Sequence, residues 1–131
     1  MKTVKRSYVY VLINHDRSMY KIGRTDNIER RILELEGFWG KFNLKGSYAI
    51  ECDRVIVNKL EKLLQYLVID DKFDFVKEDR KSGHSEFFKF SSFARLKRFV
   101  KNDLPKFKKN IEYIDLENYL RDKKYEGILL S

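Results

Sequence analysis

The stretch SYVYVLINHDRSMYKIGRTDNIERRILELE, residues 7–36, decides the fold. Residues 7–13 and 20–23 are rich in β-branched and aromatic side chains, and the polar residues 14–18 have the length of a hairpin turn. The pattern predicts two antiparallel strands. Their register stays open, because a shift of one residue in the turn places Tyr10 opposite either Lys21 or Ile22.

A helix is predicted directly after this hairpin. Asp26 stands where a helix N-cap is expected, and Glu29, three residues later, completes a capping box. The helix is expected to run from about residue 27 to residue 36 and to end at Gly37. Its apolar residues share one face, which is expected to pack on the sheet: Ile28, Ile32 and Leu35.

The two adjacent arginines of this helix are predicted to differ in direction. Arg31 lies about 60° from Ile28 on the helical wheel, whereas Arg30 points roughly the opposite way, into solvent. An arginine turned toward a sheet needs anions for its five donors. A neighbouring carboxylate such as Glu34 and a substrate phosphate both satisfy that need, and the sequence leaves the choice open.

The remaining segments predict a single α/β (α+β) domain. Residues 38–46 are expected to form a loop, 47–51 a third strand and 53–67 a buried helix. Residues 86–90 fit either a short strand or the entry to a helix, 91–102 a helix stopped by Pro105, and 111–124 a last helix before Gly127. The expected fold is a small central antiparallel sheet flanked by helices. Residues 1–91 are expected to form its core, with residues 92–131 as a basic helical C-terminal extension packed on the same domain.

Composition narrows the functional classes. Hydrophobic residues make up 43% of the 131 positions, which excludes a disordered chain. The net charge of +8 draws polyanions, so nucleic acid is the leading partner, although charge does not choose between DNA and RNA. Cys52 is the single cysteine, which excludes an internal disulfide and fits a reducing compartment. No uncharged run approaches the roughly 18 residues of a membrane span, so we expect a soluble, intracellular protein that does not bind membranes.

A polar stripe runs along the predicted helix over residues 53–67. Its members are spaced at i, i+4, i+7 and i+11: Arg54, Asn58, Glu61 and Gln65. Glu61 is the acid nearest the apolar face. A carboxylate at a helix edge is usually only solvated, but a nuclease that uses one hard cation needs such a group to hold Mg²⁺.

A second basic region lies near the C-terminus. Seven basic residues and one acid, Asp103, occupy positions 95–109. On the predicted helix Arg95 and Arg98 point outward and Lys101 lies toward the rim. These side chains form either a phosphate-tracking surface or an ordinary solvated face.

Several of these residues carry a resemblance to a known family. Tyr8-Val9-Tyr10, Tyr20-Lys21-Ile22-Gly23 and the arginine eight positions after that glycine resemble the motifs of the GIY-YIG endonuclease superfamily, in particular its branch in bacteriophages and large DNA viruses. Residues 60–64, around Glu61, and residues 85–88, with Glu86, resemble that branch's helix glutamate and its later E-W-F segment. The resemblance covers residues 7 to about 91.

The resemblance implies roles for individual residues. Those matching the family's catalytic tyrosine, second-motif glycine, catalytic arginine and metal-binding glutamate are Tyr10, Gly23, Arg31 and Glu61. The place of the second catalytic tyrosine is taken by Lys21, with Tyr20 one residue earlier, and alternation along a strand puts these two on opposite faces. Tyr8, Gly23 and Arg24 are the expected contacts to nucleic acid in this region.

The implied function is hydrolysis of phosphodiester bonds, of DNA in preference to RNA, with Mg²⁺ or Mn²⁺ as cofactor. One alternative is a catalytically inactive module that binds nucleic acid on the same scaffold. Another is a protein-interaction domain with incidental positive charge. The protein is expected to act as a monomer or, to cut both strands, as a homodimer.

Overall fold

The computed structural model describes residues 5–73 and 87–130, with side chains up to residue 123. Five strands form one antiparallel sheet in the order β4-β2-β1-β3-β5. This α+β architecture confirms the expected fold class. The strands are β1 (Arg6–Asn14), β2 (Met19–Thr25), β3 (Phe42–Asp53), β4 (Phe87–Lys89) and β5 (Glu112–Asp115).

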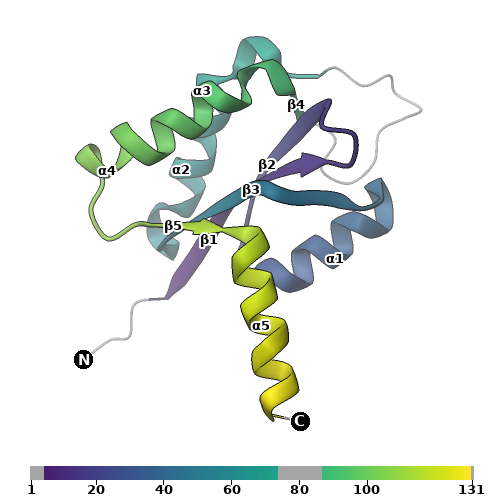
Figure 1. Cartoon of the computed structure of the whole chain (residues 1–131). Coiled ribbons are helices and arrows are strands. Elements are labelled where there is room, and N and C mark those ends of the chain that lie inside the picture. The colour runs from purple at the N-terminus through teal and green to yellow at the C-terminus, as the bar shows by residue number, and fades with distance from the viewer. Residues whose placement is uncertain (1–4, 74–86, 131) are drawn as a thin grey trace.

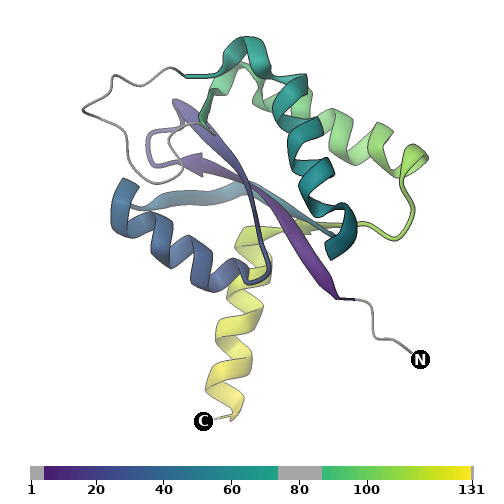
Figure 2. The same cartoon turned by 180° about the vertical axis from the view of Figure 1, so that it is seen from behind.

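Helices lie on both faces of the sheet (Figures 1 and 2). One face is covered by α2 (Arg54–Leu67), α3 (Phe93–Arg98) and α4 (Leu104–Phe107), and the other by α1 (Ile28–Trp39) and the start of α5 (Leu116–Leu130). In the described part of the chain, no helix is both long enough and apolar enough to cross a membrane.

Each face of the sheet has its own hydrophobic core, because side chains alternate along the strands. Val9 and Val11 of β1 pack under α2 and α3, whereas Tyr10 and Leu12 pack with α1. The apolar face predicted for α1 is buried as expected, at Ile28, Ile32 and Leu35. The two cores hold α1 and α2 on opposite sides of β1 and β2.

The hairpin register differs from both alternatives considered above, because Tyr10 pairs with Gly23. The turn between β1 and β2 comprises residues 15–18, so it is one residue shorter than the expected turn over residues 14–18. In this turn the Asn14 side chain accepts hydrogen bonds from the backbone N–H groups of Ser18 and Met19, and Arg17 has a positive φ of 57°. Tyr10 therefore pairs one residue further toward the C-terminal end of β2 than Ile22, and two further than Lys21.

The boundaries of α1 also differ from the prediction. Asn27, not Asp26, is the N-cap, and its side chain accepts a hydrogen bond from Arg30 N–H. Asp26 instead accepts a hydrogen bond of 2.7 Å from the Ser7 hydroxyl and pairs with Arg54. The helix continues past Gly37 and ends at Gly40, whose φ of 81° suits a residue without a side chain.

Four further expectations for the rest of the chain are wrong. Residues 42–46 belong to the long strand β3 rather than to a loop, and residues 112–115 form the edge strand β5 rather than helix. Pro105 does not stop the helical course but lies in the first turn of α4, where a missing N–H is tolerated. Gly127 lies within α5. Because β5 pairs with β3, the C-terminal segment shares one sheet with the N-terminal half.

Candidate active site

Tyr10 and Gly23 face each other across the β1–β2 pair. A Cβ atom on Gly23 would lie under 3.0 Å from three atoms of the Tyr10 ring and hydroxyl, so only glycine leaves room for this phenol. From the sequence, Gly23 was expected to contact nucleic acid. The structure gives a more direct reason for the glycine, because the phenol itself occupies the space beside Gly23.

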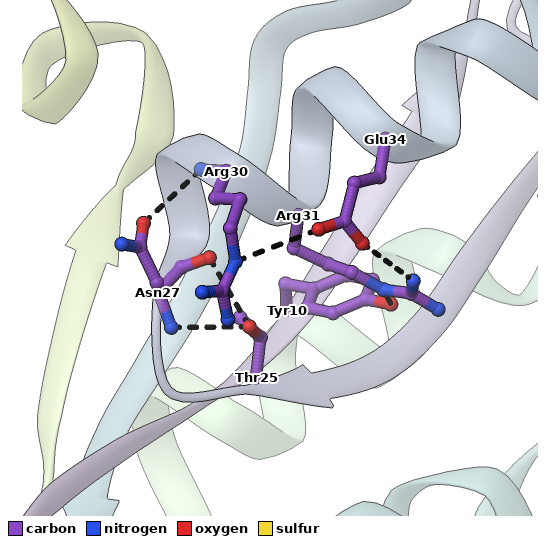
Figure 3. A network of polar contacts seen from close by, with 6 residues as sticks. All are labelled: Tyr10, Thr25, Asn27, Arg30, Arg31 and Glu34. Carbon is purple, nitrogen blue, oxygen red and sulfur yellow. Dashed lines mark hydrogen bonds and ion pairs between the residues drawn. The ribbon is translucent and has the colours of Figure 1, made fainter.

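Arg31 reaches the Tyr10 hydroxyl from the first turns of α1 (Figure 3). Its Nε donates a hydrogen bond of 3.4 Å to the phenol oxygen, and its Nη1 donates to Glu34 Oε2 at 3.2 Å. Burial acts to lower the pKa of Arg31, but the contacts with Tyr10 and Glu34 outweigh it and raise the pKa above its ordinary value. Arg31 is therefore a permanent cation fixed beside the phenol.

The neighbouring Arg30 points in a different direction, as the wheel predicted. Its side chain is 68% exposed, against 29% for Arg31, and it pairs with the other oxygen of Glu34 at 3.5 Å. Figure 3 shows Glu34 between the two guanidinium groups, with only Arg31 lying over Tyr10. The N-cap at Asn27 fixes the start of α1 and hence the position of both arginines.

Helix α2 supplies the carboxylate on the other side of the sheet. Glu61 lies on the α2 flank that faces β2, and its Oε1 is 3.4 Å from Nε of Arg24. One turn further along, Gln65 Nε2 donates a hydrogen bond of 3.2 Å to the backbone carbonyl of Ile22. These two contacts hold α2 against the edge of β2, beyond the residues that pair with β4.

A polar pocket of about 250 Å³ is lined by Tyr10, Arg24, Arg31 and Glu61. Strands β1 and β2 and helices α1 and α2 each contribute one of these side chains. Figure 2 shows why they can meet, since β2 runs between α1 on one side and α2 on the other. The pocket thus combines a phenol, two guanidinium groups and a carboxylate. This set can bind a phosphate and move a proton.

The side chains that line the pocket fit a hard cation only when water and substrate supply the remaining ligands. Among the described residues, no group of three or more His, Cys, Asp or Glu side chains lies close enough together to hold a metal by itself. Glu61 is the one carboxylate that lines the pocket in this part of the chain. Mg²⁺ is commonly held by one or two carboxylates, with water and substrate phosphate oxygens completing its octahedron, so the residues present fit such an ion in the presence of substrate.

Lys21 and Tyr20 occupy opposite faces of the sheet. Lys21 is fully buried on the α1 side, with Nζ 6.0 Å from the centre of the Tyr10 ring and 5.6 Å from that of Phe87. Tyr20 packs in the core under α3, where its hydroxyl lies 2.5 Å from the Ser92 hydroxyl. The structure therefore places Lys21, but not Tyr20, on the same face of the sheet as Tyr10, although neither residue lines the pocket.

The other candidate residues lie away from the pocket lining. Tyr8 is half-buried beside Tyr119 of α5, and burial together with this neighbour raises its pKa to about 12. Arg95 and Arg98 line a separate hollow of about 330 Å³ between the end of α2 and α3. Lys101 covers the Tyr113 ring at 4.9 Å. Glu86 lies outside the described residues.

Sequence reasoning did not identify the polar link that positions the β2–α1 connection. The Ser7 hydroxyl donates to Asp26 Oδ1 at 2.7 Å and also bonds the carbonyl of Thr25 at 3.0 Å, while Arg54 approaches Asp26 Oδ2 at 3.4 Å. This link ties β1 and α2 to the turn that leads into α1. The local signal for it is a small polar residue, Ser7, directly before the apolar run of β1.

The fold and the pocket define a small α+β domain with one polar site at the edge of its sheet. A family model of the T5orf172 domain matches residues 7–111, which include all of the pocket side chains, and the chain belongs to this family. The T5orf172 domain is generally regarded as related to the GIY-YIG nucleases, although the match itself names no GIY-YIG motif. Searches of curated proteins and of solved structures found no match.

Proposed function

We propose that this protein is a divalent-metal-dependent endonuclease that hydrolyses phosphodiester bonds in nucleic acid, with DNA as the preferred substrate. One observation carries the proposal. Side chains from four separate elements, Tyr10, Arg24, Arg31 and Glu61, line a single pocket. A phosphodiester needs cationic groups at its oxygens, a base for the attacking water and a carboxylate for a metal ion, and this pocket contains each of them.

Arg31 has the central role in this proposal. Its guanidinium is fixed by Tyr10 and Glu34 on the inner side of α1, so it can stabilise the negative charge that builds on the phosphate in the transition state. Arg24 lies across the pocket and binds a further phosphate oxygen. Because Arg31 is in place before the substrate arrives, little reorganisation of this cation is needed during the reaction.

Tyr10 is the proposed base. Its phenolate takes a proton from the attacking water, whose oxygen forms the new bond to phosphorus, and the bond to the leaving oxygen breaks on the opposite side. Arg31 Nε, 3.4 Å from the phenol oxygen, stabilises the phenolate. Glu61 would hold Mg²⁺ or Mn²⁺, and the ion would supply Lewis-acid neutralisation of the phosphate charge.

A nicking assay tests the proposal directly. Supercoiled plasmid is incubated with Mg²⁺ and with wild-type, Glu61→Gln, Arg31→Ala or Arg30→Ala protein. Arg30 is the matched control, because it is the adjacent arginine and pairs with the same Glu34 but lies outside the pocket. We expect nicking by wild type and Arg30→Ala, and none by the other two. If the wild type retards the plasmid on a gel but leaves it intact, the chain is a binding module instead.

A further inference from the structure

Arg24 and Glu61 form an ion pair within the proposed active site. Only 10% of the Glu61 side chain is exposed, whereas 52% of the Arg24 side chain is. The carboxylate has therefore lost most of its hydration, while the arginine keeps access to solvent. Nε of Arg24 lies 3.4 Å from Oε1 of Glu61. Glu61 is the carboxylate to which the proposed function assigns the divalent cation.

We propose that a substrate phosphate and the divalent cation bind this pocket cooperatively, because Arg24 neutralises Glu61 until a phosphate draws it away. The inference rests on the proposed function and adds to it that substrate and cation regulate each other's binding. Without nucleic acid, Arg24 competes with the cation for Glu61. With nucleic acid present, Arg24 pairs with the phosphate and no longer competes with the ion for the carboxylate.

The electrostatics of the pocket favour this order. A cation that approaches Glu61 in the free protein must displace Arg24 from a poorly hydrated carboxylate, or remain beside it as a like charge. A phosphate placed between Arg24 and the ion attracts both and removes the repulsion. The exposed fraction of Arg24 allows its guanidinium to turn from Glu61 toward a phosphate without disturbing the core.

Arg31 is not equivalent to Arg24 in this respect. It is held by Tyr10 and Glu34 on the α1 side of the sheet, whereas Arg24 pairs with the proposed metal-binding carboxylate on the α2 side. The structure thus separates one arginine that is fixed for the transition state from another that exchanges partners. Coupling between cation and phosphate is expected to depend on Arg24.

The coupling is reciprocal, since linkage requires each ligand to change the affinity of the other by the same factor. Couplings between ligand sites commonly amount to about 5- to 150-fold in affinity. We expect a short DNA duplex to tighten Mn²⁺ binding within this range, and Mn²⁺ to tighten DNA binding by the same factor.

The test measures Mn²⁺ binding from the electron paramagnetic resonance signal of the free ion, with and without the duplex. All proteins carry Tyr10→Phe to keep the DNA intact, which a denaturing gel verifies. Arg24→Gln is compared with Arg30→Gln, whose arginine pairs with Glu34 outside the pocket. Duplex alone, and Glu61→Gln protein with duplex, measure the Mn²⁺ that is bound by DNA itself.

The expected result is coupling in the parent and in Arg30→Gln. In Arg24→Gln we expect tighter Mn²⁺ binding without DNA and a smaller gain than in the parent when DNA is added. A purely structural role of the Arg24 pair would change stability but leave the coupling intact, which would overturn the inference. Glu61-dependent Mn²⁺ binding that is equal with and without DNA overturns the coupling but leaves the nuclease proposal standing. An absence of Glu61-dependent binding in both conditions overturns both.

Discussion

The phenol of Tyr10 lies directly over the backbone of Gly23 on the neighbouring strand, in the space that a side chain at position 23 would fill. The pair brings the hydroxyl within 3.4 Å of Arg31 Nε. The smallest residue of the pocket region thereby sets the position of its proposed base. Even a methyl group at position 23 has to move Tyr10 away from Arg31.

Gly23→Ala is therefore predicted to disturb both folding and cleavage. Overpacking of this kind destabilises a protein by about 1–3 kcal/mol, and a displacement of about 1 Å in an active site lowers the rate by about a hundredfold. Urea denaturation and plasmid nicking at saturating DNA measure the two effects. Gly37→Ala is the matched control, because nothing lies within 4 Å of its added Cβ, and it is expected to leave cleavage unchanged. Normal nicking by Gly23→Ala would contradict the proposed role of Tyr10.

The two tyrosines suggested by the sequence are predicted to behave differently. Tyr10→Phe removes the hydroxyl at Arg31 and keeps the ring, so we expect cleavage to fall by about 10²- to 10⁴-fold with DNA binding retained. Tyr20→Phe removes a hydrogen bond to Ser92 in the opposite core, which is expected to lower stability by about 1 kcal/mol without changing the rate per folded molecule. Single-turnover cleavage and thermal unfolding separate the outcomes. Equal losses of cleavage rate in the two variants would contradict the assignment of the catalytic role to Tyr10 alone, which lies on the opposite face of the sheet from Tyr20.

How far the site was predictable depends on whether each contact is local. The opposite directions of Arg30 and Arg31 follow from helical periodicity, so the sequence alone distinguished them. The pairing of Tyr10 with Gly23 did not follow, because the register is set by the Asn14 side chain and the positive φ of Arg17 within the turn.

Contacts between distant segments were the least predictable. Strand β5 is a short edge strand that pairs with β3, more than 60 residues earlier in the chain. Because this partner is distant, the local pattern of residues predicted a helix instead. The ion pair of Arg24 with Glu61 likewise joins β2 to α2, and its existence depends on the packing of α2 under the sheet. Periodicity gives the face that each element presents but not the partner that this face meets.

Stability is predicted to fall on the alkaline side because of buried thiol and phenol groups. Burial raises the pKa of Cys52 from its ordinary value of 9.0 to about 11. The pKa values of Tyr20 and Tyr113 are raised, chiefly by burial, to about 12. The folded state therefore keeps protons that the unfolded chain releases. The contribution of Cys52 is complete below pH 9.0 and is lost as the pH rises toward about 11.

Urea unfolding at several values across this pH range measures the effect. For a single group the free energy of unfolding falls by about 1.4 kcal/mol per pH unit between the two pKa values. In Cys52→Ala, the free energy of unfolding is expected to fall less steeply with pH, by up to this amount per pH unit. Any packing that the substitution removes lowers the free energy of unfolding equally at every pH and does not change the slope. Tyr20→Phe serves as the comparison, with its smaller slope appearing only above the ordinary tyrosine pKa of 10.0. If the free energy of unfolding falls with pH equally in wild type and Cys52→Ala, the thiol does not contribute to the loss of stability.

The basic surface on α3 is predicted to contribute to DNA affinity but not to the cleavage step. Arg98 lines the hollow between α2 and α3, which shares no lining residue with the pocket of Tyr10 and Arg31. If it contacts one phosphate, Arg98→Gln lowers the slope of log K against log salt concentration by about 0.9, because one counterion fewer is released. The rate at saturating DNA is expected to remain that of the wild type. Arg121→Gln on α5 removes the same charge elsewhere, where Arg121 bonds Asn118 at 2.6 Å, and is expected to leave the salt slope unchanged. Equal slopes for wild type and Arg98→Gln would assign the α3 surface to ordinary solvation.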